Sequence, residues 1–191
     1  MVIIYILLIL FSFSSTAQAD EVEPDAYQSI VDESGNITLP QKYRHQWNHI
    51  GSWLIEDPEA PGHGFHDVYL QSDAVTHYRK TGQFPDGAVI VKEVRKIEHG
   101  SKTTGQAQWA GGIKIWFVMI KDSKGRFKAN PHWANGWGWA LFEANSGDGN
   151  TAEKTLPQKN VSMGFAPSCQ GCHTPAMAKD WVFIEGYPTL K

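Results

Sequence analysis

Residues 88–144 carry the clearest hydrophobic patterning in the chain. In AVIVKEVRKIEH (88–99), apolar and polar positions alternate after a PDG turn, which predicts a long β-strand. Residues 105–122 are strongly apolar and WGWALFEA (137–144) again suits a strand, so both predict further strands. Gly111 and Gly112 stand side by side in the first of these stretches, which predicts a β-bulge or a place where something flat approaches the backbone.

Shorter elements precede this region. Residues 50–56 and 65–71 predict two strands around a loop rich in proline and glycine. Pro40 predicts the start of a short helix, and Ser72 predicts the N-cap of a helix that ends at Gly82. Together these elements predict a mainly β (α+β) fold: a single antiparallel sheet-rich domain of four or five strands with a few short helices.

The first residues resemble a targeting segment. An apolar run over residues 2–13 is followed by a polar stretch and by Ala17-Gln18-Ala19, a small-x-small cleavage pattern. This predicts a signal peptide over 1–19 and an exported, periplasmic domain over 20–191. A membrane anchor is the alternative, but the run is shorter than the ~20 residues that cross a bilayer as a helix.

Charge and composition narrow the class of protein. The net charge is −3 with both signs interspersed, which gives no indication of a nucleic-acid partner. The chain has 18 glycines and 8 tryptophans, a balance typical of a strand-rich fold with many turns and a bulky aromatic core.

Both cysteines lie close to the C-terminal end, in Cys169-Gln170-Gly171-Cys172-His173. C-x-x-C-H is the pattern of covalent haem attachment: two thiols bond the haem vinyl groups, and the histidine reaches the iron from the same helical turn. The motif therefore predicts one haem c, bound through Cys169 and Cys172, with His173 as the iron ligand on a C-terminal helical turn. A disulfide, a redox-active dithiol or a zinc site are the alternatives, and none of them requires the adjacent histidine.

The group on the other face of the iron is left open by the motif. Met177 follows His173 by four residues and lies on the same side of the haem, so it cannot reach the opposite face. Most of the upstream histidines fall in loops, turns or polar helix faces, and an open coordination position is favoured. The upstream candidates for a sixth ligand are Met119, Met163, Lys92 and the histidines at 45, 49, 63, 66, 77, 99 and 132.

Lys92 stands out within the long strand. Alternation places Lys92 in an otherwise apolar row with Ile90 and Val94, and places Glu93 on the other side. A buried ammonium is costly, so such a lysine is paired, deprotonated or chemically used; the alternative is a lysine that extends to solvent at a sheet edge. In the next strand one row has no polar group and would form a dry pocket beside a haem: Ile113, Ile115, Phe117 and Met119.

These segments resemble the cytochrome P-460 family, which includes the beta-type cytochromes c-prime. The resemblance is carried by HYRKTGQFPDGAVIVKEV (77–94), SCQGCH (168–173) and VFIEGYPTL (182–190). It implies an antiparallel β fold, usually homodimeric, and one c-type haem with a histidine on one side and an open position on the other. It further implies oxidation of hydroxylamine to nitrous oxide or nitric oxide, and a third covalent link from Lys92 to a haem edge carbon.

The sequence departs from the enzymes of that family at one position. Alignment of IKDS (120–123) places Phe117 where the enzymes carry a distal carboxylate that takes protons from the substrate. An apolar cap is closer to the non-catalytic relatives, which bind nitric oxide and carbon monoxide. Three functions therefore stay open: a hydroxylamine-oxidising enzyme with a periplasmic electron acceptor, a nitric-oxide-binding protein, and an electron carrier with histidine and methionine ligands.

Overall fold

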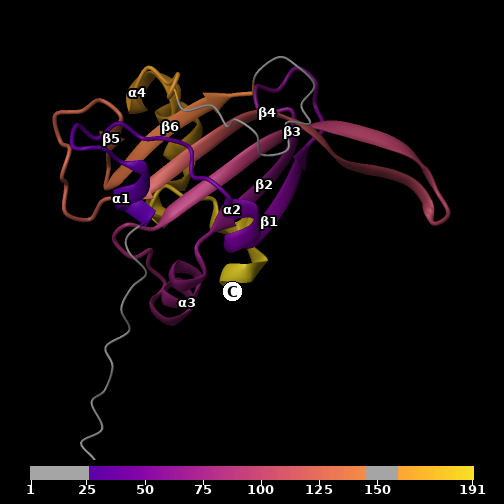
Figure 1. The fold of residues 1–191 in the computed structure, drawn as a ribbon. Helices are drawn as coiled ribbons and strands as arrows, with labels where there is room; N and C mark the ends of the chain where they lie inside the picture. Colours follow the sequence, from indigo (N-terminus) through magenta and orange to yellow (C-terminus); the bar gives the residue numbers. More distant parts are fainter. Residues whose placement is uncertain (1–25, 145–158) are drawn as a thin grey trace, which may run out of the picture.

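The computed structural model describes residues 26–144 and 159–191, and within these residues the strands form one antiparallel sheet (Figure 1). The order across the sheet is β1-β2-β3-β4-β6-β5. This confirms the predicted mainly β domain. The strands are β1 (Asn48–Ile55), β2 (Gly64–Leu70), β3 (Val89–Lys102), β4 (Gly105–Lys121), β5 (Trp133–Ala134) and β6 (Trp137–Glu143).

The helices are short and lie around this sheet. None of those in the described residues is long and apolar enough to cross a membrane. The predicted signal peptide, residues 1–19, lies outside the described residues. The helices are α1 (Ala26–Ile30), α2 (Tyr43–Gln46), α3 (Ser72–Thr81), α4 (Phe165–Ser168) and α5 (Gln170–His173), followed by three 3₁₀ turns, η1 (Thr174–Lys179), η2 (Ile184–Gly186) and η3 (Pro188–Leu190).

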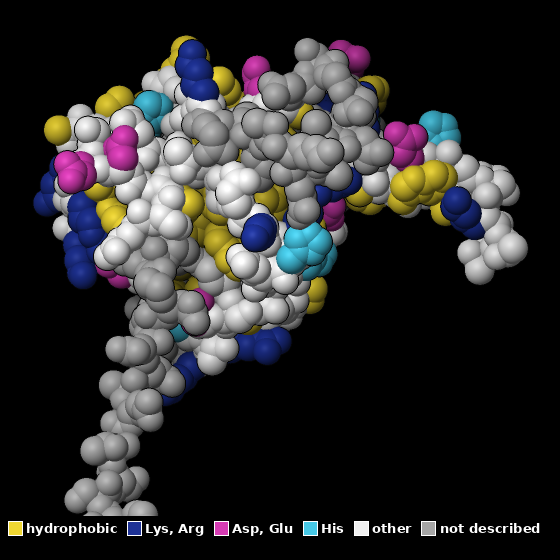
Figure 2. Space-filling view, in the orientation of Figure 1, with side chains coloured by type: hydrophobic (Ala, Val, Ile, Leu, Met, Phe, Trp, Pro, Cys, Tyr) yellow, Lys and Arg dark blue, Asp and Glu magenta, His cyan; other side chains and the backbone are white. Residues whose placement is uncertain are grey.

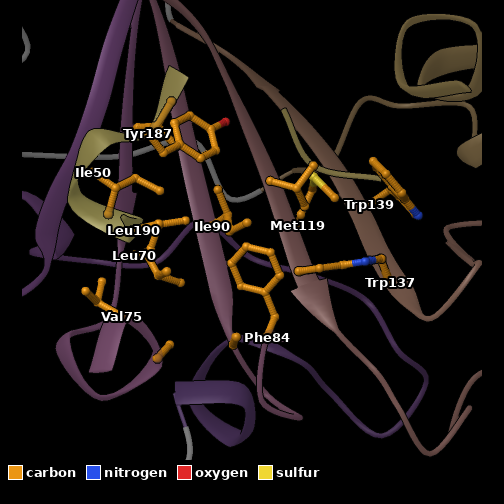
Figure 3. Packing of buried hydrophobic residues seen from close by; sticks show 14 of the residues in the cluster. Ile50, Leu70, Val75, Phe84, Ile90, Met119, Trp137, Trp139, Tyr187 and Leu190 are labelled. Carbon is orange, nitrogen blue, oxygen red and sulfur yellow. The ribbon is translucent and has the colours of Figure 1, made fainter. Parts of the chain in front are cut away.

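Each face of the sheet buries its own apolar cluster, because successive side chains of a strand point to opposite faces. We call the face covered by α3 and by the C-terminal segment 165–190 the front face, and the face covered by the segment 27–43 the back face. Figure 3 shows part of the front cluster, with Met119 next to Trp139 and Phe84 between Ile90 and Trp137. The back cluster includes Val89, Val91, Trp116, Val118 and Phe142.

Two of the predicted helix starts differ from the structure. Helix α2 begins at Tyr43, after Lys42 in a left-handed conformation (φ 55°), so Pro40 does not open it. Ser72 is the first residue of α3 rather than its cap; the capping position belongs to Gln71, whose side-chain oxygen accepts a hydrogen bond from the Val89 amide at 2.7 Å. The predicted end is confirmed, since Gly82 adopts φ 73° and donates to the Tyr78 carbonyl.

The pairing of β3 with β4 contains two irregularities. Arg95 pairs with Ile113 and Ile97 with Ala110, so the predicted bulge at Gly111 and Gly112 is confirmed. The Glu98 side chain lies over Gly111, where an added Cβ would come within 2.7 Å of its Cγ atom. The second register shift lies between Val94 and Arg95 and leaves Lys114 without a partner residue in the β3–β4 pairing.

Strands β3 and β4 continue beyond their neighbours as a two-stranded arm over residues 97–110 (Figure 1). Hydrophobic atoms are exposed on this hairpin arm (Figure 2), where the Trp109 side chain is 39% exposed. The Lys102 ammonium lies 4.1 Å from the centroid of the Trp109 ring.

Candidate functional site

The C-x-x-C-H motif forms a single helical turn at the front face. The Cys169 amide donates to the Phe165 carbonyl at 2.9 Å, and the His173 amide donates to the Cys169 carbonyl at 3.1 Å. Side chains three and four residues apart lie on one side of a helix, so this turn presents both thiols and the imidazole together. Cys169 is buried and Cys172 is exposed, and both thiols are free.

His173 is held in one tautomer. Its Nδ1 atom lies 2.8 Å from the Trp181 carbonyl oxygen, which can only accept, so Nδ1 carries the hydrogen and Nε2 keeps a free lone pair. The ring packs edge-on against Trp139, with 4.8 Å between centroids, and lies 5.7 Å from the Phe183 ring. Burial lowers the pKa of His173 to about 4, and the Lys92 charge acts in the same direction. The imidazole is therefore neutral and can bind a metal through Nε2.

A strained turn places the carbonyl that holds His173. Asp180 and Trp181 both adopt left-handed conformations (φ 55° and 65°), which are uncommon outside glycine. The Asp180 carboxylate accepts hydrogen bonds from the Lys121 ammonium at 2.7 and 2.8 Å and from the Trp137 indole at 3.2 Å. These bonds fasten the turn to the sheet, and so they fix the direction of the His173 ring.

Lys92 lies on the front face, as the alternation of β3 predicts. It pairs with Val68 on β2 and with Phe117 on β4, and its side chain is half-buried. Burial lowers the pKa of Lys92 to about 8, while negative charge on Cys172 and Cys169 would raise it. The amine is thus within electrostatic reach of the motif, and a larger fraction of it is neutral near physiological pH than of an exposed lysine.

Phe117 lies beside Lys92 on the same face, with the Lys92 ammonium 4.5 Å from the centroid of the ring. The predicted apolar row of β4 holds for Met119, which belongs to the front cluster, but it is wrong for Ile113. Ile113 packs in the back cluster, because the unpaired Lys114 reverses the alternation.

Glu93 points to the back face, as expected from its position next to Lys92. The carboxylate is fully buried and accepts hydrogen bonds from the Tyr43 hydroxyl, from Arg44 at 2.5 Å and from Arg95 at 2.8 Å. A buried carboxylate with two cationic partners has its charge satisfied locally. Glu93 therefore stabilises β3 from behind and takes no part in the front-face site.

The candidate sixth ligands are scattered. Met119 is 7% exposed inside the front cluster, and Met163 is 74% exposed on the surface. His49, His77, His99 and His45 are exposed, and His132 hydrogen-bonds to Asn130 and to the Ser162 carbonyl. No cluster of three potential ligands (His, Cys, Asp or Glu) that could hold a metal ion occurs in residues 26–144 and 159–191, which gives no support to the zinc alternative.

His66 differs from the other candidate histidines in being buried, and the sequence provided no reason to prefer it among them. It is 6% exposed, and its place in β2 puts it on the front face with Val68, two residue pairs away from Lys92. The alternation in FHDVYL contains this signal, since His66 shares a row with Val68 and Leu70, much as Lys92 shares a row with Ile90.

An antiparallel sheet whose front face carries a C-x-x-C-H turn, a neutral histidine and a half-buried lysine has the residues that hold a covalently attached haem. The family model Cytochrome P-460 matches residues 40–184, which is most of the chain. The chain therefore belongs to the cytochrome P-460 family and is a haem protein of that kind. A search of curated proteins found no match.

The residues at this site fit the cofactor of the family. The free Nε2 of His173 suits iron, and the helical turn presents two thiols beside it. The front face also carries half-buried apolar side chains that the haem would cover. These are Phe117 and its cross-strand partner Leu141, with Phe183 nearby.

Proposed function

We propose that this protein is an exported, mono-haem c-type cytochrome that oxidises hydroxylamine to nitrous oxide or nitric oxide. In this proposal Cys169 and Cys172 bond the haem covalently, and His173 is the iron ligand. Lys92 forms the third link to the ring edge. The observation that carries the proposal is the position of Lys92, a half-buried amine of lowered pKa on the same face as the C-x-x-C-H turn.

Each residue contributes a separate property. A haem iron with one open position supplies binding of small nitrogen species and transfer of their electrons. The Trp181 carbonyl keeps the His173 ring oriented, and burial keeps its imidazole neutral. The lowered pKa of Lys92 leaves part of the amine neutral and nucleophilic, as a bond to carbon requires. Forming this bond breaks one N–H bond of the amine and the C–H bond of the ring edge carbon, so two protons leave and an oxidant of the peroxide class takes up two electrons.

The activity is tested with the purified ferric holoprotein, hydroxylamine and an added electron acceptor. We expect loss of hydroxylamine with formation of nitrous oxide or nitric oxide, and a red-shifted ferrous absorption band. Lys92→Met should remove the red shift, whereas Lys96→Met, an exposed lysine of the same strand, should leave it unchanged. Absence of hydroxylamine consumption at any pH would rule out the enzymatic proposal.

A second candidate function is capture of nitric oxide without turnover. Phe117 favours it, because a phenyl ring beside Lys92 excludes water and cannot transfer a proton. This candidate predicts a five-coordinate iron that binds nitric oxide, and no consumption of hydroxylamine in the assay above.

The setting of the protein is proposed on the same basis. A signal peptide over 1–19 would place the domain in the periplasm, where a soluble electron acceptor would take the electrons. We also propose a homodimer, in which the exposed hairpin arm of one copy contacts the other. An isolated two-stranded hairpin is only marginally stable in water, which supports a partner for the arm.

A further inference from the structure

His66 is a buried polar side chain on the front face, in an otherwise apolar row. Its cross-strand partners are Val94 on β3 and Trp53 on β1, and its ring lies 5.9 Å from the Trp53 ring. His66 pairs with Val94 and Val68 pairs with Lys92, so His66 and Lys92 lie on the same face of neighbouring strands, two residue pairs apart. The Lys92 charge also contributes to the lowered pKa of His66.

The hydrogen bonds of His66 define what it can offer. Its Nε2 atom lies 2.6 Å from the Gly62 carbonyl oxygen, and because a carbonyl only accepts, Nε2 carries the hydrogen. In a neutral imidazole the other nitrogen, Nδ1, is then an acceptor. Nδ1 is buried and has no hydrogen-bond partner in the part of the chain that the structure describes. Buried acceptors are rarely left unpaired, so this atom indicates a ligand.

The ring is neutral and well fixed. Burial is the main cause of its lowered pKa; the bond to Gly62 opposes this effect, and the charges of Lys92 and Lys114 add to it. Gly62 lies against the ring, since a Cβ there would come within 3.4 Å of His66 Cε1. Nδ1 is therefore an acceptor held in place, and not a donor.

We propose that His66 Nδ1 accepts a hydrogen bond from the small nitrogen ligand of this site and selects for ligands that carry hydrogen. Hydroxylamine has N–H and O–H groups to donate, whereas nitric oxide and carbon monoxide have none. His66 is thus a specificity-determining residue, in a chain whose Phe117 supplies no polar group. This inference rests on the haem pocket described under the proposed function.

The test compares two ligands in His66→Phe holoprotein by equilibrium spectral titration, without an electron acceptor. Loss of one neutral hydrogen bond should weaken hydroxylamine binding to the ferric protein by roughly 5-fold to 10-fold. Carbon monoxide binding to the ferrous protein should stay unchanged. His66→Asn keeps an acceptor oxygen and should recover part of the hydroxylamine affinity, and His49→Phe, at an exposed position on β1, is the matched control.

Two results would overturn the inference: hydroxylamine binding that is the same in His66→Phe, or equal weakening of both ligands, which would indicate a structural role. Turnover is measured separately. A wild-type protein that binds hydroxylamine in a His66-dependent way without consuming it would refute the enzymatic proposal and support the role of His66. Consumption of hydroxylamine by a protein whose hydroxylamine binding is unchanged in His66→Phe would support the enzymatic proposal and refute the role of His66.

Discussion

Phe117 sets the access of small ligands to the proposed pocket. Its ring lies half-buried beside the Lys92 amine, on the face that carries the C-x-x-C-H turn. A phenyl ring at this point offers van der Waals contact and no proton, so its effect on a diatomic ligand is steric.

Phe117→Ala should therefore speed the association of nitric oxide with the ferrous protein severalfold, because the variant removes the steric barrier. Stopped-flow absorbance measures this rate. Phe127→Ala is the control, since Phe127 is also half-buried but packs against Tyr27 and Trp133 on the back face. An association rate that does not change in Phe117→Ala would show that the ring is not a cap.

At the residue scale, the sequence predicted the position of Lys92, predicted the wrong face for Ile113, and named His66 only as one of seven candidate histidines. Alternation along β3 was enough to place Lys92, because this part of the strand pairs regularly with both neighbours. It failed for Ile113, because a single unpaired residue at Lys114 reverses the row. His66 lay in a short strand, and its significance depends on a buried nitrogen without a partner, which no sequence pattern reports.

Among the elements, β3 is the one whose two faces have separate roles. Lys92 faces the site, and Glu93 is buried behind it with Arg44 and Arg95 as partners. Removing the charge of Glu93 would leave the buried charges of its partners without compensation. This lowers stability by more than the intact ionic group contributes to it.

Glu93→Gln should consequently lower the free energy of unfolding by about 3 kcal/mol. Urea denaturation followed by tryptophan fluorescence measures this loss. The control Glu98→Gln changes an exposed carboxylate of the same strand and should stay within about 0.5 kcal/mol of the parent protein. A loss of similar size in both variants would contradict the role given to Glu93.

The elements differed in how well the sequence predicted them. Long strands with sustained alternation were predicted close to their observed bounds, and the glycine stop of α3 was confirmed. Strand β5 was missed because two residues cannot show a period. The start of α2 was missed because it depends on Lys42 in a left-handed conformation, which a lysine does not signal.

For the whole molecule, the hairpin arm is the feature that a single sheet does not explain. It extends past the other strands (Figure 1). Trp109 is exposed on the arm, and the Lys102 ammonium lies over its ring. In the proposed homodimer this indole is covered by the second copy, and aromatic side chains commonly anchor such contacts.

Trp109→Ser should then shift the protein from dimer towards monomer at micromolar concentration, with the absorption spectrum of the haem unchanged. Sedimentation velocity measures the distribution of species. Lys102→Ser is the control, because it changes the same arm and leaves the Trp109 indole in place. A change at Trp53 would not serve, because Trp53 packs against the front cluster. A parent protein that sediments as a monomer would contradict the proposed dimer.

The central claim is that Cys169, Cys172 and Lys92 hold one haem, and mass spectrometry of a tryptic digest tests it most directly. A bond at Lys92 blocks cleavage there, so we expect residues 81–95 to remain joined to residues 160–179 through the macrocycle. In Lys92→Arg the haem should stay on 160–179 alone. Recovery of 160–179 from the parent protein without the mass of a haem would contradict the account.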